Sequence, residues 1–272
     1  MNTVVRRIIT GVLVGIFVGI VIWVGEPWFT ITACLVAALG AFEFYRMVNS
    51  EHVQPLACLG IFFCLLIVLN AHSQSSLTMP ILMAAITVIP LIWVLFRKNK
   101  DNSFASWGWT VAGVLYIGLM ISFYINMRAL SDGRWWAYLV LACTALCDVF
   151  AYAVGSNLGK HAMATSVSPG KTWEGAAGGM AASIFFAVIL GLCFQLPGQW
   201  WQFFILGAII GLFSQIGDLV ESLLKRNAGK KDAGHLLPGH GGILDRIDSH
   251  LLVGPIAYYG IFFANEIGWF IR

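Results

Sequence analysis

Residues 214–249 read SQIGDLVESLLKRNAGKKDAGHLLPGHGGILDRIDS and gather charged side chains in a chain that is otherwise almost entirely apolar. The first half of the stretch continues an apolar run, so we predict a helix there. Helical spacing puts four polar side chains on one face, Asp218, Glu221, Ser222 and Lys225. Such a face is costly in lipid unless it meets protein, water or an ion. The stretch therefore predicts a polar site near one end of a membrane-spanning helix.

The composition of the whole chain is that of an integral membrane protein. Of its 272 residues, 59% are hydrophobic and only 11% are charged, which lies outside the range of soluble domains. The six cysteines lie in apolar runs without a C-x-x-C pair, so we predict buried small hydrophobic side chains and not a disulfide or metal framework. No nucleic-acid partner is expected.

Apolar runs of the ~17–25 residues that cross a bilayer recur along the chain. Nine can be placed, at 8–24, 28–47, 56–71, 78–96, 111–125, 135–155, 172–194, 200–224 and 251–271. They predict an all-α polytopic integral membrane protein with about nine transmembrane helices. The third and fifth runs are short, so eight or ten helices would also fit the pattern.

The lysines and arginines orient this layout. With the N-terminus in the cytoplasm, all of the 16 lie on the cytoplasmic side except Arg128, Arg134 and Arg272. This positive-inside bias predicts a cytoplasmic N-terminus and two cytoplasmic loops, residues 156–171 and 225–249. The basic residues ahead of the first run also occur in secretory signals, but no cleavage site follows, so we predict an uncleaved first helix.

The polar residues divide the chain unevenly. We separate N-terminal transmembrane helices, residues 1–130, which provide scaffold and lipid access, from a C-terminal catalytic region, residues 131–272. In the first part, Glu43 and Arg46 lie three residues apart, and we interpret them as a local ion pair.

Asp148 is the first polar oddity of the C-terminal region. It lies inside the sixth apolar run, on one helical face with Tyr152 and Gly155. An acid within a membrane helix is by default functional, although solvation by the following loop is the alternative.

The segment SPGKTWEG, residues 168–175, leads into the seventh run. Thr172 is placed to cap that helix. A helix N-terminus beside Ser168 and Lys171 is suited to an anion, whereas capping alone would also explain Thr172.

A glycine-rich turn and two aspartates end the charged stretch. Backbone N–H groups around Gly241 and Gly242 can wrap an anion, and Asp245 and Asp248 lie three residues apart at the predicted start of the last helix. A basic loop that binds anionic lipid headgroups is the alternative, but the aspartates would repel such headgroups unless cations intervene. Carboxylates, amines and this turn together predict metal ions that hold a phosphate chain.

The same stretch resembles the signature of the phosphatidate cytidylyltransferases, also called CDP-diacylglycerol synthases. The matching residues are S-L-L-K-R-N-A-G-K-K-D-A-G-H-L-L-P-G-H-G-G-I-L-D-R-I-D, at 222–248. The resemblance extends upstream through DVFAYAVGSNLGK and SPGKTWEG and covers roughly the C-terminal half, while the first five runs match only in being hydrophobic. One departure is Gly170, where family members usually have a lysine, so the phosphate-binding role of that turn rests on Lys171.

The resemblance implies a membrane enzyme of phospholipid biosynthesis that joins CTP and phosphatidate to give CDP-diacylglycerol and diphosphate, with Mg²⁺ required. We expect one or two ions, a site facing the cytoplasm from the inner membrane, and contact with membrane lipids; a homodimer is left open. The expected mechanism is in-line attack of the phosphatidate phosphate on the α-phosphorus of CTP. Positioning and charge neutralisation then supply most of the catalysis.

The candidate residues fall into three roles. We assign metal binding to Asp148, Asp218, Asp245 and Asp248. Catalysis is assigned to Asp218, Lys225, Asp245 and Arg246. Substrate binding is assigned to Lys160, Ser168, Lys171, Thr172, Ser222, Arg226, Lys231, His240, Gly241 and Gly242.

Two other functions are compatible with the sequence. A cation-coupled secondary transporter would bind its coupling ion at Asp148, Asp218 and Glu221. Transporters often have two related halves, however, and here the polar residues crowd one half. A nucleotidyltransferase that uses CTP with another lipid phosphate is the closer alternative, because nothing in the apolar half distinguishes the lipid acceptors.

Overall fold

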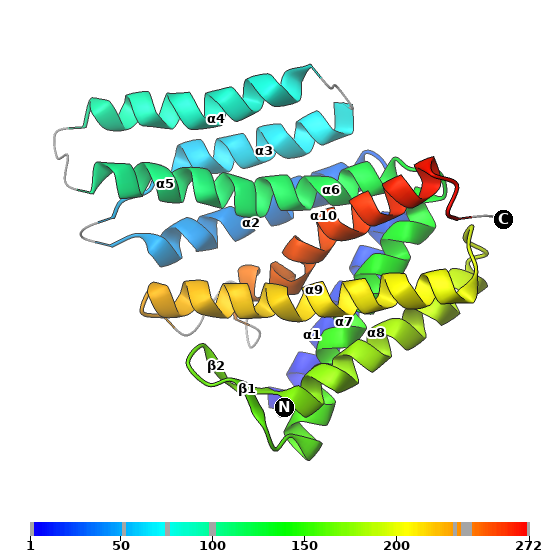
Figure 1. The fold of residues 1–272 in the computed structure, drawn as a ribbon. Helices are drawn as coiled ribbons and strands as arrows, with labels where there is room; N and C mark the ends of the chain where they lie inside the picture. Colours follow the sequence, from blue (N-terminus) through cyan, green and yellow to red (C-terminus); the bar gives the residue numbers. More distant parts are fainter. Residues whose placement is uncertain are drawn as a thin grey trace. The chain divides into compact units, whose positions relative to one another are not determined.

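The computed structural model describes residues 3–50, 53–73, 77–97, 102–230, 233–234 and 241–270, with the backbone alone for 3–10. Two predicted substrate-binding residues, Lys231 and His240, lie outside the described residues. The elements, drawn in Figure 1, are α1 (Thr3–Val24), α2 (Trp28–Val48), α3 (Ala57–Ser73), α4 (Thr78–Leu95), α5 (Ser103–Gly113), the π-helix η1 (Val114–Leu119), α6 (Met120–Arg128), α7 (Gly133–Leu158), β1 (Ala162–Ala164), β2 (Ser168–Thr172), α8 (Trp173–Cys193), α9 (Trp200–Asn227) and α10 (Leu244–Glu266).

The predicted class, an all-α polytopic membrane protein, is confirmed. Each predicted apolar run corresponds to a helical segment, with α5, η1 and α6 forming one continuous helix. Within the described residues, 7 segments are long and apolar enough to cross a membrane. The two shorter apolar segments are α3 and residues Gly11–Val24 of α1. The side of the membrane on which the N-terminus lies stays a prediction.

Polar residues at the start of a helix account for the largest errors in the predicted boundaries. The fifth run was expected from residue 111, but its helix begins at Ser103. The Thr110 hydroxyl donates to the Ser106 carbonyl at 2.7 Å, so a hydroxyl in this turn is satisfied by the helix itself and does not end it. The last helix, α10, begins at Leu244, so Asp245 and Asp248 lie in its first turns as predicted.

The predicted loop at 156–171 contains a β-hairpin, which the sequence did not indicate. Strands β1 and β2 pair antiparallel, with Ala162 opposite Thr172. Strands this short carry too few residues to show an alternating pattern. Thr172 caps α8 as predicted, since its hydroxyl accepts a hydrogen bond from the Gly175 N–H at 3.1 Å. The hairpin therefore delivers its second strand directly to the N-terminus of α8.

The chain divides into two compact units, and it passes between them three times. The first unit comprises Met1–Asn126 and Ala228–Arg246; the second comprises Met127–Asn227 and Ile247–Arg272. In the first unit, the Tyr45 hydroxyl of α2 donates to the Thr110 carbonyl of α5 at 2.8 Å. The Tyr45 ring lies so close to Gly60 and Gly113 that a Cβ at either position would overlap it. These contacts fix α2 against α3 and α5.

In the second unit, glycines let three long helices approach one another. A Cβ at Gly179 of α8 would lie 2.8 Å from the Cys147 carbonyl of α7. A Cβ at Gly207 of α9 would lie 2.7 Å from the Cα of Ile184 in α8. Small residues at helix contacts are typical of membrane proteins, because backbones must approach closely to gain packing energy.

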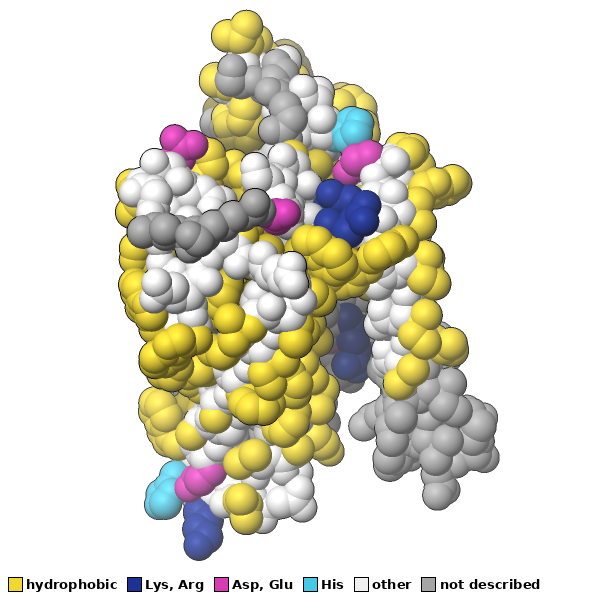
Figure 2. Space-filling view, turned by 90° about the vertical axis from the view of Figure 1, so that its right-hand side faces the viewer, with side chains coloured by type: hydrophobic (Ala, Val, Ile, Leu, Met, Phe, Trp, Pro, Cys, Tyr) yellow, Lys and Arg dark blue, Asp and Glu magenta, His cyan; other side chains and the backbone are white. Residues whose placement is uncertain are grey.

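Much of the molecular surface is apolar, as expected for a protein that faces lipid. In the view of Figure 2, hydrophobic side chains are spread over the face and charged side chains are few. All six cysteines are free. Cys64, Cys143 and Cys147 are buried as predicted, but Cys58 and Cys193 are exposed, so the prediction that every cysteine is buried was wrong. In lipid an exposed thiol needs no aqueous environment, because it behaves as a small hydrophobic group.

Candidate active site

Three acidic side chains of the second unit converge into what we call the carboxylate cluster: Asp218 and Glu221 of α9 and Asp248 of α10. One carboxylate oxygen of each lies within 4.8 Å of the others. Glu221 has an exposed fraction of 0% and Asp248 of 7%, so two members are withdrawn from solvent. All three offer only oxygen ligands, which suits a hard divalent cation.

Gly217 allows the two helices of the carboxylate cluster to meet. A Cβ at Gly217 would lie 2.8 Å from the Asp248 carbonyl and 3.0 Å from the Cα of Ser249. The residue before Asp218 is therefore in close contact with the backbone of α10 at Asp248. The Ser249 N–H in turn donates to the Asp248 Oδ1 at 2.7 Å and orients that carboxylate.

Asp148 of α7 is joined to the same two helices through hydroxyl groups. Its Oδ1 accepts hydrogen bonds from Ser214 of α9 at 3.0 Å and from Ser249 of α10 at 3.2 Å. Of the polar face predicted for the sixth run, Asp148 thus contacts α9 and α10, whereas Tyr152 is exposed. Asp148 is held by neutral donors and contributes a fourth acid to this region of the second unit.

Two lysines contact the carboxylate cluster. The Lys171 Nζ lies 2.7 Å from the Asp218 Oδ2, and the exposed fractions of these side chains are 21% and 38%. Lys225, one turn after Glu221 on α9, forms an ion pair with the Glu221 Oε2. With every group ionised, these acids and lysines, Asp148 included, retain a net negative charge. The region can therefore attract a cation while offering ammonium groups to an anion.

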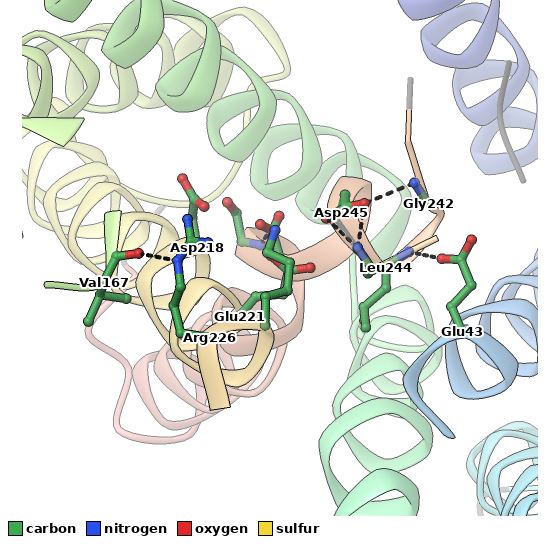
Figure 3. A network of polar contacts seen from close by, with 12 residues as sticks. Glu43, Val167, Asp218, Glu221, Arg226, Gly242, Leu244 and Asp245 are labelled. Carbon is green, nitrogen blue, oxygen red and sulfur yellow. Dashed lines mark hydrogen bonds and ion pairs between the residues drawn. The ribbon is translucent and has the colours of Figure 1, made fainter. Parts of the chain in front are cut away.

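Hydrogen bonds from α9 and from α8 hold the β1–β2 hairpin beside this region. The Arg226 Nε of α9 donates to the Val167 carbonyl at 3.1 Å, a contact drawn in Figure 3. Glu174 in the first turn of α8 accepts from the N–H groups of Lys160 and His161, at 3.1 and 3.2 Å. Lys171 is therefore presented by a braced strand and not by a loose loop.

Other predicted substrate-binding residues of the second unit lie on the same elements. Ser222 is buried on α9 beside Glu221, and Ser168 lies at the start of β2. Lys160 is exposed, between α7 and the hairpin. The substrate-binding roles of Ser222 and Ser168 stay predictions.

Asp245 belongs to the first unit, at the N-terminus of α10. Its Oδ2 accepts from the Gly242 N–H at 2.9 Å and from the Ala233 N–H at 3.3 Å. Gly241 has φ +78, a left-handed conformation that favours glycine, so the turn needs its glycine for backbone reasons. The exposed Arg246 follows at the surface. The structure thus shows Asp245 bound to the backbone of its own loop.

Two acids, Glu221 and Glu43, were not assigned to the site from the sequence. Glu221 was placed on the polar face of its helix but not among the metal ligands. Glu43 was read as the partner of Arg46, yet its Oε2 accepts a hydrogen bond from the Leu244 N–H at 2.8 Å (Figure 3). A lone acid inside an apolar run is the one sequence signal that could have identified Glu43.

The fold and the site define a polytopic membrane protein with an acid-rich, lysine-bearing region suited to cations and phosphates. The chain belongs to the Cytidylyltransferase family, which matches residues 5–264. It is 34% identical over 261 residues to the phosphatidate cytidylyltransferase of Bacillus subtilis, covering 93% of this chain and 96% of that protein. The phosphatidate cytidylyltransferases of Synechocystis (32% over 284 residues, 93% and 95%) and Brucella abortus (32% over 272 residues, 97% and 96%) are similar over their lengths too.

Proposed function

We propose that the protein is a phosphatidate cytidylyltransferase, which converts CTP and phosphatidate into CDP-diacylglycerol and diphosphate. The observation that carries the proposal is the carboxylate cluster with Lys171 and Lys225 bound to it, in a chain whose full-length relatives bear that name. Both substrates are anionic, so their phosphates repel each other until positive charge lies between them.

The reaction needs little from a general base. A phosphatidate phosphate oxygen attacks the α-phosphorus of CTP; a phosphorus–oxygen bond forms there as the bond to the β-phosphate bridging oxygen breaks and diphosphate leaves. The attacking phosphate monoester is already ionised near neutral pH. Catalysis therefore consists mainly of positioning the two substrates and neutralising their charge.

The acids supply the ligands for a divalent cation. Asp218, Glu221 and Asp248 would hold Mg²⁺, and Asp148 and Asp245 remain proposed ligands on the pattern of the sequence. One or two bound ions would screen the negative charge of the reacting phosphates. The choice of Mg²⁺ rests on the all-oxygen donor set and on the family.

The basic side chains and the backbone donors would bind the phosphate groups. Lys171 and Lys225 carry ammonium groups at the carboxylate cluster. Arg226 and Arg246 add guanidinium groups, which match phosphate oxygens in pairs. Lys160, Ser168, Thr172, Ser222, Lys231, His240, Gly241 and Gly242 complete the proposed binding residues.

The proposed location is the inner membrane, with the site facing the cytoplasm, where CTP is present. The positive-inside distribution of lysines and arginines supports this orientation. The acyl chains of phosphatidate would remain in lipid while its phosphate reaches the site. A homodimer stays a prediction, which sedimentation of the detergent-solubilised protein tests.

The test is an assay of purified protein with radiolabelled CTP, phosphatidate and Mg²⁺. Phosphatidate-dependent label in the chloroform phase is expected, together with diphosphate in the water phase. Absence of chloroform-soluble label would overturn the proposal. A transporter would give this result, because it forms no lipid-linked nucleotide. Parallel reactions with a polyprenyl phosphate determine whether another lipid acceptor is preferred.

Asp218→Asn tests the role of the cluster directly. The amide keeps the size of the side chain but removes the negative charge that binds the cation, so turnover should fall at least about a hundredfold, in the range of a lost essential electrostatic contact. Glu266→Gln, at an exposed acid near the end of α10, is the control and should keep wild-type turnover. Wild-type turnover by a correctly inserted Asp218→Asn variant would contradict the assignment.

A further inference from the structure

Glu43 lies at a buried position, where an ionised carboxylate costs free energy. It belongs to α2, a helix apolar enough to cross a membrane, and its exposed fraction is 1%. A buried carboxylate needs hydrogen-bond donors to offset its lost hydration. The structure supplies a distant donor, the Leu244 N–H at 2.8 Å from the Glu43 Oε2, 201 residues along the chain. Glu43 therefore joins the second helix of the chain to the start of its last one.

The donor is one that a helix leaves open. Leu244 is the first residue of α10, and the N–H groups of a first helical turn have no partner within their helix. The N-terminus of a helix also carries partial positive charge, which favours a nearby carboxylate. Glu43 thus supplies from another helix the acceptor that a capping residue would normally provide.

The loop is shaped to receive this side chain. A Cβ at Gly234 or at Gly242 would overlap the Glu43 carboxylate, so both positions need the absence of a side chain for reasons of space. Two separate segments of the loop, before and after residues 235–240, therefore close around one acid of α2. All of these residues belong to the first unit.

Asp245 shares the same loop. Its carboxylate accepts from the Gly242 and Ala233 N–H groups, at 2.9 and 3.3 Å. The two acids therefore bind neighbouring backbone groups: Ala233 and Gly242 for Asp245, and Leu244 for Glu43 (Figure 3). A shift of Leu244 would move Asp245, because the residues are adjacent.

We infer that Glu43 is a positioning residue for nucleotidyl transfer: it fixes the Gly242 turn and the first residue of α10 and thereby the carboxylate of Asp245. The inference rests on the proposed function, which assigns Asp245 to metal binding. It gives the N-terminal helices a defined part in the chemistry, because α2 holds a segment of the family signature in place.

The contact itself is tested without activity, by hydrogen–deuterium exchange of peptides that cover residues 241–247. Glu43→Leu keeps the approximate volume but cannot accept a hydrogen bond, so exchange in this segment should accelerate about tenfold or more, as expected for a lost bond to a charged acceptor. Glu43→Gln retains an oxygen acceptor and should stay close to wild type. Unchanged exchange in Glu43→Leu would overturn the inference.

The functional consequence is tested by Mg²⁺ titration of activity. Glu43→Leu should raise the Mg²⁺ concentration for half-maximal turnover about fivefold or more, since Asp245 is no longer held in place, while Glu43→Gln restores most of the wild-type response. A purely structural role predicts a loss of folded protein with an unchanged Mg²⁺ response in what remains, and that result would overturn the inference. Glu26→Gln, at an acid just before α2, is the control and should change neither measurement.

A second pair of variants keeps the inference testable if Glu43→Leu does not fold. Gly234→Ala places a methyl group against the Glu43 carboxylate and should accelerate the same exchange. The aspartate side chain in a Glu43→Asp background is one methylene shorter. Gly234→Ala should therefore accelerate exchange less in that background than in the wild type. An equal acceleration of exchange by Gly234→Ala in both backgrounds would refute the contact. Failure of the proposed function is distinguished by a wild-type protein that makes no CDP-lipid, whereas failure of this inference leaves wild-type activity intact.

Discussion

At the scale of single residues, lysine ammonium groups pair with the acids that would bind a metal. Lys171 contacts Asp218 at 2.7 Å, and Lys225 is paired with Glu221. These ion pairs lower the cost of holding several carboxylates close together. Under the proposed function, each lysine would bind either its acid in the protein or a phosphate of the substrate.

This arrangement predicts that Lys171 competes with a divalent cation for Asp218. A partly exposed ion pair is worth up to about 1 kcal/mol, so Lys171→Met should lower the dissociation constant for Mn²⁺ by up to about fivefold in the protein without substrates. Turnover should fall at the same time, because the proposed phosphate contact is lost. Electron paramagnetic resonance of free Mn²⁺ measures the binding.

Lys171→Arg is the matched variant, since it keeps the positive charge at this position. Its Mn²⁺ affinity should remain near that of the wild type. Weaker or unchanged Mn²⁺ binding by Lys171→Met would show that the lysine does not occupy the position of the cation.

At the scale of elements, close packing of α7, α8 and α9 places the polar residues. A Cβ at Gly175 would lie 2.7 Å from the Ala151 carbonyl, and a Cβ at Gly179 would lie 2.8 Å from that of Cys147. The two glycines are one turn apart on α8, so α7 lies directly against this stripe. The spacing between these helices sets the position of Asp148, which lies on α7 between Cys147 and Ala151 in sequence.

Gly179→Ala should therefore destabilise the protein although alanine is the better helix former. The added methyl group must push α7 away, at a cost of about 1–3 kcal/mol for an overpacked contact. The midpoint of thermal unfolding in detergent measures the loss. Gly260→Ala on α10 is the control, because nothing lies within 4 Å of its Cβ, and it should leave the midpoint unchanged or raise it. Equal behaviour of the two variants would contradict the packing argument.

Helices are the elements that the sequence predicts well, and long-range contacts are those it does not. Hydropathy located every helical segment, and the three-to-four-residue spacing put Asp218 and Glu221 on one face. The pairing of β1 with β2 was missed because strands of 3 and 5 residues carry too little periodic signal. The contact of Glu43 with Leu244 was missed for a different reason: only the tertiary structure brings together residues 201 positions apart.

At the scale of the whole molecule, the odd number of predicted spans places the two termini on opposite sides of the membrane. With a cytoplasmic N-terminus, a reporter fused after Arg272 should lie outside: alkaline phosphatase active and green fluorescent protein dark. The matched fusion after Arg97, following the fourth segment, should give the reverse pattern. A fluorescent fusion after Arg272 would overturn the predicted orientation.

The return of residues 228–246 to the first unit has a consequence for how this enzyme can be dissected. A gene truncated before residue 127 would encode the carboxylate cluster but not α2, so the Gly242 turn would lose the acid that receives Leu244. The two units cannot be separated by a single cut in the sequence. A polypeptide that begins or ends near residue 127 would contain a segment whose folding partner is missing.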